Sequence, residues 1–280
     1  MVPPWVPDPM LPASPPDGAG PAGGDGQGDQ QTPGQNQSAP QTAPTAPAAP
    51  QPTPIAPAAR FRRARRSLGN FASSGDSREM RRGLRHYVQS GYGGRGTGVR
   101  RFGGTASTAG ALYGALSNVA GGRAPSAGSP LDPVLLAGRS AREIMDAVVE
   151  AVRPADGTQD AEAGRAAIKD ALSELLTMFP QADLLNLSEV QRGFAIERFV
   201  ANDVFRRFHL DLGKTIQDKA PTAIVGLARL KDVKNYIKET ISAAFRKLRA
   251  AGNRLTTGRI NEFVRDALSQ TLQVFEDYAG

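Results

Sequence analysis

The sequence has 280 residues, a net charge of +7 and no cysteine, which excludes disulfides and thiolate metal sites. Its two histidines offer no zinc-site spacing, so we expect neither a metal nor a cofactor. Residues 1–5 show no basic segment followed by an apolar core, and the sequence has no apolar run of about 18 residues. We therefore expect a cytoplasmic protein without a signal peptide or a membrane span.

Residues 1–59 are predicted to be a disordered N-terminal arm. Most of their side chains are small or polar, and Ile55 is the only large apolar one beyond the first eleven residues. Such a stretch cannot bury enough apolar surface to offset the entropy of ordering. The tip differs, because the only tryptophan, Trp5, follows Pro3 and Pro4 among apolar neighbours. These three residues are candidates for a partner-docking peptide, the alternatives being an apolar remnant without function or an intramolecular strand.

Residues 60–104 form a second part, a basic segment rich in arginine and glycine. Residues 60–101 hold 12 arginines against two carboxylates, a net charge of +10, whereas residues 1–59 carry −4 and residues 102–280 carry +1. A polyanion or an acidic partner should therefore bind in this segment. The candidate binding residues are Arg60, Arg62, Arg63, Arg65, Arg66, Arg81, Arg82, Arg85, Arg100 and Arg101.

One helix is predicted within the basic segment, at about residues 77–90. Met80, Leu84 and Val88 recur there at the spacing of a single helical face. The glycine-rich stretch that follows, residues 91–104, is predicted to be a flexible basic loop.

Three interpretations of the basic segment stay open. It could bind nucleic acid, with Phe61, Phe71, Tyr92 and Phe102 stacking on bases. It could bind an acidic protein partner or fold back on acidic residues of the chain's own helices. It could also be a solvated face whose charge is only compositional. The acidic residues considered for the folded-back form are Asp156, Asp160, Glu162, Asp170 and Glu174.

Residues 105–280 are predicted to be a helical domain, because none of their segments shows the alternation typical of a strand. The fold class is therefore mainly α, a helical bundle or layered helical array behind the disordered arm. The apolar row from Leu227 to Leu248 could be a dimer seam or the core face of a bundle helix. The surrounding charges lack the pattern of a coiled coil, which favours the core face.

Several helix starts are marked by capping signals. Ser140 with Glu143 predicts a capping box, Ser188 predicts the start of another helix, and Thr256 or Thr257 is predicted to cap the last one.

We predict no catalytic residue and no enzyme activity. The sequence has no P-loop, no nucleophile elbow and no zinc-protease motif. His86 and His209 are expected to be structural or solvent-facing.

In the order of its features the chain resembles the QatB component of the Qat anti-phage defence system. The resemblance covers roughly residues 2–11 and 60–280. It is carried by the Pro-Pro-Trp peptide, the low-complexity arm, Arg60-Phe61-Arg62-Arg63-Ala64-Arg65-Arg66, Phe71-Ala72-Ser73-Ser74-Gly75, Leu84-Arg85-His86-Tyr87-Val88, Gly93-Gly94, Leu135-Leu136-Ala137-Gly138-Arg139 and Glu143-Ile144.

This resemblance implies an operon with an ATPase, a QueC-like enzyme and a TatD-like nuclease, in which this chain is a non-enzymatic scaffold or adaptor subunit. It also implies that the QueC-like enzyme acts on a glycine at the N-terminus of a partner protein. The present sequence departs from that pattern, because it begins Met1-Val2-Pro3. The alternative function is a stand-alone nucleic-acid-binding protein that uses residues 60–101.

Overall fold

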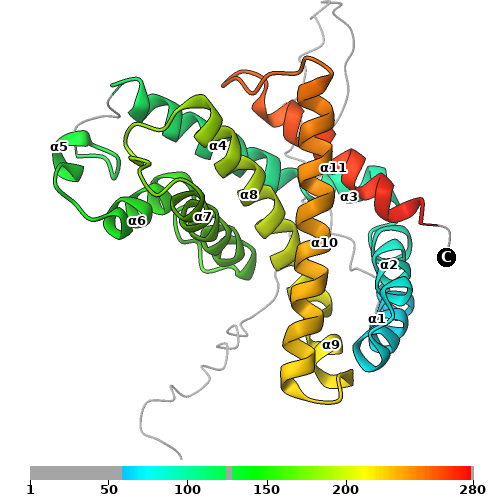
Figure 1. The fold of residues 1–280 in the computed structure, drawn as a ribbon. Helices are drawn as coiled ribbons and strands as arrows, with labels where there is room; N and C mark the ends of the chain where they lie inside the picture. The colour runs from blue at the N-terminus through cyan, green and yellow to red at the C-terminus, as the bar shows by residue number, and fades with distance from the viewer. Residues whose placement is uncertain (1–58, 124–127, 279–280) are drawn as a thin grey trace, which may run out of the picture. The chain divides into compact units, whose positions relative to one another are not determined.

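The computed structural model describes residues 59–123 and 128–278, and the regular elements in these ranges are all helical (Figure 1). The prediction of a mainly α protein is confirmed. Among these residues, no helix combines the length and apolar character needed to cross a membrane. The predicted arm lies outside the described residues except for Ala59.

The helices follow one another along the chain with short connections. In chain order they are α1 (Arg62–Ser74), α2 (Ser77–His86), the π-helical turn η1 (Tyr87–Gly91), α3 (Arg95–Arg101), α4 (Gly103–Ala120), α5 (Pro133–Leu136), α6 (Ala141–Val152), α7 (Gln159–Met178), α8 (Glu189–Phe208), the π-helical turn η2 (His209–Gly213), α9 (Lys214–Lys219), α10 (Ala223–Ala250) and α11 (Ile260–Glu276).

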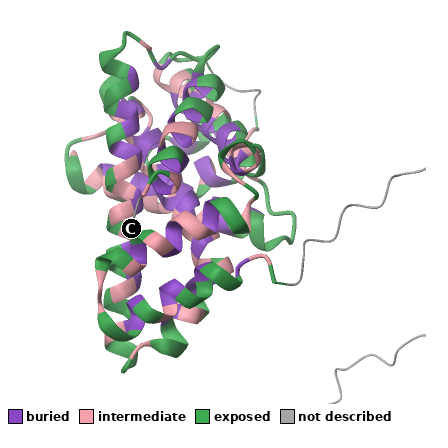
Figure 2. Ribbon diagram, turned by 90° about the vertical axis from the view of Figure 1, so that its right-hand side faces the viewer, coloured by how far each residue is buried: buried purple, intermediate pink, exposed green. Residues whose placement is uncertain are grey.

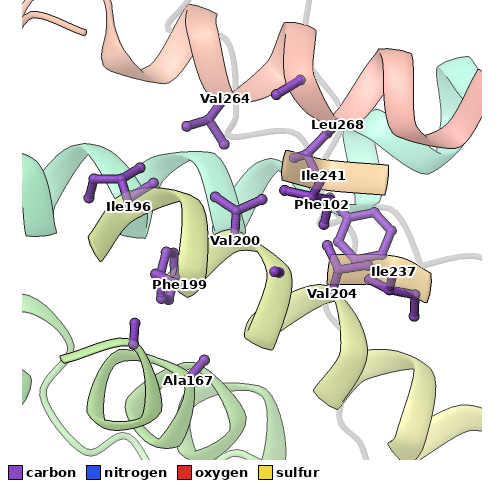
Figure 3. Close-up of a cluster of buried hydrophobic side chains, with 14 of the residues drawn as sticks. Phe102, Ala167, Ile196, Phe199, Val200, Val204, Ile237, Ile241, Val264 and Leu268 are labelled. Carbon is purple, nitrogen blue, oxygen red and sulfur yellow. The ribbon is translucent and has the colours of Figure 1, made fainter. Parts of the chain in front are cut away.

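Apolar side chains on the inward sides of these helices form a shared hydrophobic core, while exposed residues cover the outward sides (Figure 2). Part of this core lies where α8 meets α4, α7 and α10, with α11 packed on α4 and α10 (Figure 3). Phe102 and Phe199 are fully buried there. Burying one such ring contributes about 1.5–3 kcal/mol to folding. Phe102 belongs to the basic segment and Phe199 to α8, so both parts of the chain stabilise the core.

Two of the three capping predictions are confirmed. Ser140 and Glu143 form a reciprocal capping box at the start of α6, and Ser188 caps α8. The prediction for the last helix is wrong, because α11 begins after Arg259 and has no side-chain cap. The backbone carbonyl of Thr256 instead accepts a hydrogen bond of 3.0 Å from the backbone N–H of Arg259. This bond forms a turn directly before α11.

The basic segment contains more helix than the sequence predicted. Helix α2 and the turn η1 together cover the predicted helix, but α1 precedes them and α3 occupies the predicted flexible loop. Gly98 of α3 is buried, and a Cβ atom there would lie 2.9 Å from Leu272 of α11. This glycine therefore allows close helix packing and does not make the segment flexible. The prediction of a flexible loop, which was based on glycine content, is wrong for α3.

The apolar row of α10 faces the core only in part. Leu230, Val233 and Ile237 are buried against neighbouring helices, as expected of a bundle helix. Leu227 begins the predicted row, but 63% of its surface is exposed. The core face of α10 therefore starts one turn later than predicted.

Candidate binding surface on the basic segment

Helix α1 presents four arginines to solvent, which we call the arginine face: Arg62, Arg63, Arg65 and Arg66. None of the four forms an ion pair with a carboxylate in the described residues. The buried residues of the helix lie on its other side and are Ala64, Ser67, Leu68, Phe71 and Ala72. Guanidinium groups bind carboxylates and phosphates through paired hydrogen bonds, so this surface suits either kind of anion.

The buried side of α1 holds the arginine face in place. Phe71 is buried, and the Arg229 guanidinium of α10 lies 5.5 Å from its ring centroid. Leu68 packs on Gly83 of α2, where a Cβ atom would lie 2.6 Å from Leu68 Cγ. The two helices approach this closely because residue 83 has no side chain. The arginines thus project from a folded platform.

Three further predicted arginines, all on α2, already have partners. Arg82 pairs with Glu79, and Arg85 donates to the Tyr278 carbonyl at 3.2 Å. The Arg81 guanidinium lies 5.7 Å from the centroid of the Tyr278 ring. Arg81 and Arg85 thus attach α2 to Tyr278, and Arg82 is paired within α2, so the three contribute to the fold rather than to the arginine face.

Arg60 is held by a cluster of Tyr87, Tyr92 and Asp211, which we call the tyrosine–aspartate cluster. Both hydroxyls donate to Asp211 Oδ2, at 3.0 Å from Tyr87 and 3.1 Å from Tyr92, and they lie 2.9 Å apart. Arg60 Nη2 lies 3.6 Å from Asp211 Oδ1. Burial raises the pKa of both tyrosines, so both remain protonated donors at neutral pH.

Two π-helical turns build this cluster, since η1 begins with Tyr87 and η2 contains Asp211. Such turns are rare and often lie at functional sites, because the extra residue re-aims side chains. Here they join the basic segment to the end of α8.

A small polar pocket of about 220 Å³ adjoins the cluster and is lined by Arg60, Tyr92, Arg101, Asp160, Arg207, Leu210 and Asp211. Arg207 lies 3.1 Å from Asp203 and 2.8 Å from Asp160. Burial opposes its charge, but these carboxylates outweigh burial and raise the pKa of Arg207. Arg101 is exposed, and Arg100 donates to the Thr97 hydroxyl at 2.9 Å. Because most of its charge is already paired, the pocket is better suited to joining helices than to binding a ligand.

The aromatic residues of the basic segment are not available to stack on bases. Phe61, Phe71 and Phe102 are buried, with 4%, 2% and 1% of their surfaces exposed. Tyr92 is half-buried and packs edge-on against Phe102, with ring centroids 5.6 Å apart. The stacking prediction is therefore wrong, because these aromatic rings pack against the rest of the protein while the arginines of α1 face solvent.

The interpretation that the basic segment folds back on the chain's own acidic residues named the wrong carboxylates. The five predicted acidic residues pair with basic residues outside the basic segment: Asp156 with Arg153, Asp160 with Arg207, Glu162 with Arg165, Asp170 with Arg206, and Glu174 with Lys238 and Arg198. The segment does contact the body electrostatically, but through Arg60 and Asp211, a carboxylate that sequence reasoning missed.

The two histidines are half-buried, and burial lowers the pKa of both His86 and His209. Neither belongs to a group of metal-ligating side chains in the described residues. Pro3, Pro4 and Trp5 lie outside the described residues.

These features define a class of protein: a helical body with an exposed basic patch on one of its helices. Residues 93–275 match the family model described as Qat anti-phage system associated protein QatB. The match spans more than half of the chain, so the chain belongs to the QatB family and is associated with the Qat anti-phage system. The resemblance inferred from the sequence is confirmed. No curated protein and no solved structure matches the chain.

Proposed function

We propose that this chain is a non-enzymatic scaffold, or adaptor, subunit of an anti-phage defence complex. Its partners would be the other products of the operon, namely a QueC-like enzyme, an ATPase and a TatD-like nuclease. The observation that supports this role is the arginine face, four exposed arginines without a carboxylate partner in the described residues, on a helix anchored in the core.

An acidic surface on a partner protein fits this patch. Each exposed ion pair contributes about 0.2–1 kcal/mol, so four pairs contribute about 2 kcal/mol, or roughly a thirtyfold change in affinity. Like-charged surfaces would be repelled, which gives the patch a role in choosing the partner. In this proposal, the apolar peptide with Pro3, Pro4 and Trp5 engages a second partner, and the protein acts in the cytoplasm.

Co-purification tests the proposal. The tagged full-length chain is expressed with its neighbouring genes at native stoichiometry, and the proteins retained at physiological salt are identified by mass spectrometry. We expect at least one operon product to be retained. Recovery of this chain alone, from cells in which the other products are present and folded, would contradict the scaffold role.

The second candidate is a nucleic-acid-binding protein, favoured by the same arginine face, because guanidinium groups also bind phosphates. The alternative predicts affinity that falls steeply with salt. If four phosphate contacts are lost in a variant with alanine at all four positions of the face, the slope of log K against log salt should shrink by about 3.6 on duplex DNA.

A matched control replaces four other exposed arginines that have no ion pair in the described residues: Arg142, Arg246, Arg254 and Arg265. Equal affinity of the two variants for DNA would exclude a specific nucleic-acid role for the arginine face.

A further inference from the structure

An apolar groove lies between α7, α8 with η2, and α10, and Leu210 lines both this groove and the small polar pocket. Its volume is about 570 Å³. Its lining residues, which define what we call the apolar groove, are Gln159, Glu162, Ala163, Asp170, Phe205, Arg206, His209, Leu210, Leu227, Leu230 and Lys234. A large part of its apolar surface is open to water, because Leu210 is 50% and Leu227 63% exposed.

This exposure extends beyond the groove itself. Ile224 lies one turn before Leu227 on α10 and is 80% exposed. Neighbouring apolar side chains left in water are typical of a surface that binds a partner. The row of α10 that the sequence assigned to the core thus begins with a residue, Leu227, that the core does not cover.

The N-terminal part of the chain enters the described structure beside this groove. Arg60 and Leu210 both line the small polar pocket, and Leu210 also lines the groove. Ahead of this point the sequence has one concentrated group of large apolar side chains, namely Val2, Trp5, Val6, Met10 and Leu11.

Charge also favours this segment as the occupant. Residues 1–59 contain four aspartates and no lysine or arginine, and Asp8 lies within the apolar peptide. Two carboxylates line the groove, but Glu162 pairs with Arg165 and Asp170 pairs with Arg206. Lys234 also lines the groove, 5.8 Å from the Phe205 ring centroid, and has no ion pair in the described residues. The arginine face begins two residues after Arg60. An acidic tether with an apolar tip therefore matches an apolar groove whose unpaired charged side chain in the described residues, Lys234, is basic.

We propose that residues 2–11 of the same chain dock in the apolar groove, with Trp5 as the anchor, until a partner takes the peptide. The tether of about 50 residues would have a root-mean-square length of about 40 Å if flexible, so it can reach a groove next to its own attachment point. A tether of this kind gives a local concentration on the order of 1 mM. A dissociation constant of about 0.1 mM would then keep about nine in ten molecules docked.

Trp5 provides a direct test, because it is the only tryptophan of the chain. The fluorescence emission of the full-length protein is compared with that of a synthetic peptide of residues 1–11. We expect the emission of the protein to be blue-shifted and its acrylamide quenching to be severalfold slower. The substitution Leu227→Asp should return both quantities to those of the free peptide.

The control substitution is Val190→Asp, at a valine that is 74% exposed on α8 and does not line the groove. It should leave the emission unchanged. Circular dichroism verifies that both variants are folded. Leu210→Asp, at a groove residue that is 50% exposed, serves as a second groove variant if Leu227→Asp does not fold.

Emission equal to that of the free peptide in the unmodified protein would overturn the proposal, as would a blue shift that the groove variants leave intact. A shift that disappears on dilution would also overturn it, because the peptide would then dock on a second copy. The proposal concerns the isolated chain, so its failure would leave the co-purification result, and the scaffold role, unaffected.

Discussion

Replacing Phe71 by alanine tests whether the arginine face stands on a cooperatively folded helix. The ring is 2% exposed on the buried side of α1. Its removal leaves a cavity and costs about 3–4 kcal/mol. The Arg229 guanidinium, 5.5 Å from the ring centroid, loses a cation–π contact worth about 0.5–1 kcal/mol in addition. We therefore expect a total loss of about 4 kcal/mol.

The assay is urea unfolding followed by circular dichroism, with the free energy of unfolding extrapolated to water. In a body of this size the same loss lowers the melting temperature by roughly 8–16 °C. Leu227→Ala is the control, since Leu227 is 63% exposed and should cost less than about 0.5 kcal/mol. A Phe71→Ala cost below about 1 kcal/mol would refute the reasoning, because α1 would then not share the cooperative core.

Two further pairs of substitutions test the contacts between helices, each by the same unfolding assay. Asp203→Ala removes a buried carboxylate that binds Thr105 Oγ1 and Arg207, so it should lower the free energy of unfolding by about 3 kcal/mol. Asp160→Ala, at a side chain that is 62% exposed, should lower it by less than about 1 kcal/mol. Gly83→Ala should cost about 2 kcal/mol through overpacking against Leu68. Gly96→Ala in α3, where a Cβ atom meets nothing within 4 Å, should be neutral or stabilising by up to about 1 kcal/mol. Equal effects at Asp203 and Asp160, or at Gly83 and Gly96, would contradict the packing described.

The sequence was sufficient for the fold class and for most of the long helices. Apolar spacing marked α2 and most of α10, and the side chains of Ser140 and Ser188 marked two further helix starts because local hydrogen bonds decide caps. Such features depend on residues close together in the chain, so they can be read without knowledge of the tertiary structure.

Features that depend on contacts between residues far apart in the sequence could not be predicted from local patterns. Gly98 looked like part of a flexible loop, because the packing of Leu272 of α11 on it involves a residue far along the chain. Asp211 gave no signal, since its role depends on two π-helical turns that bring it to Tyr87 and Tyr92. The arginines of α1 were identified, but their separation from the buried aromatic residues required the helix itself.

The most direct test of the scaffold account measures the affinity of this chain for a co-purified operon partner at physiological salt. The chain is compared with the variant that has alanine at Arg62, Arg63, Arg65 and Arg66. The control variant has alanine at the four exposed arginines outside the arginine face, Arg142, Arg246, Arg254 and Arg265. The account predicts a loss of roughly thirtyfold for the first variant and less than about threefold for the control. Equal affinities of both variants would contradict the claim that the arginine face is the docking surface.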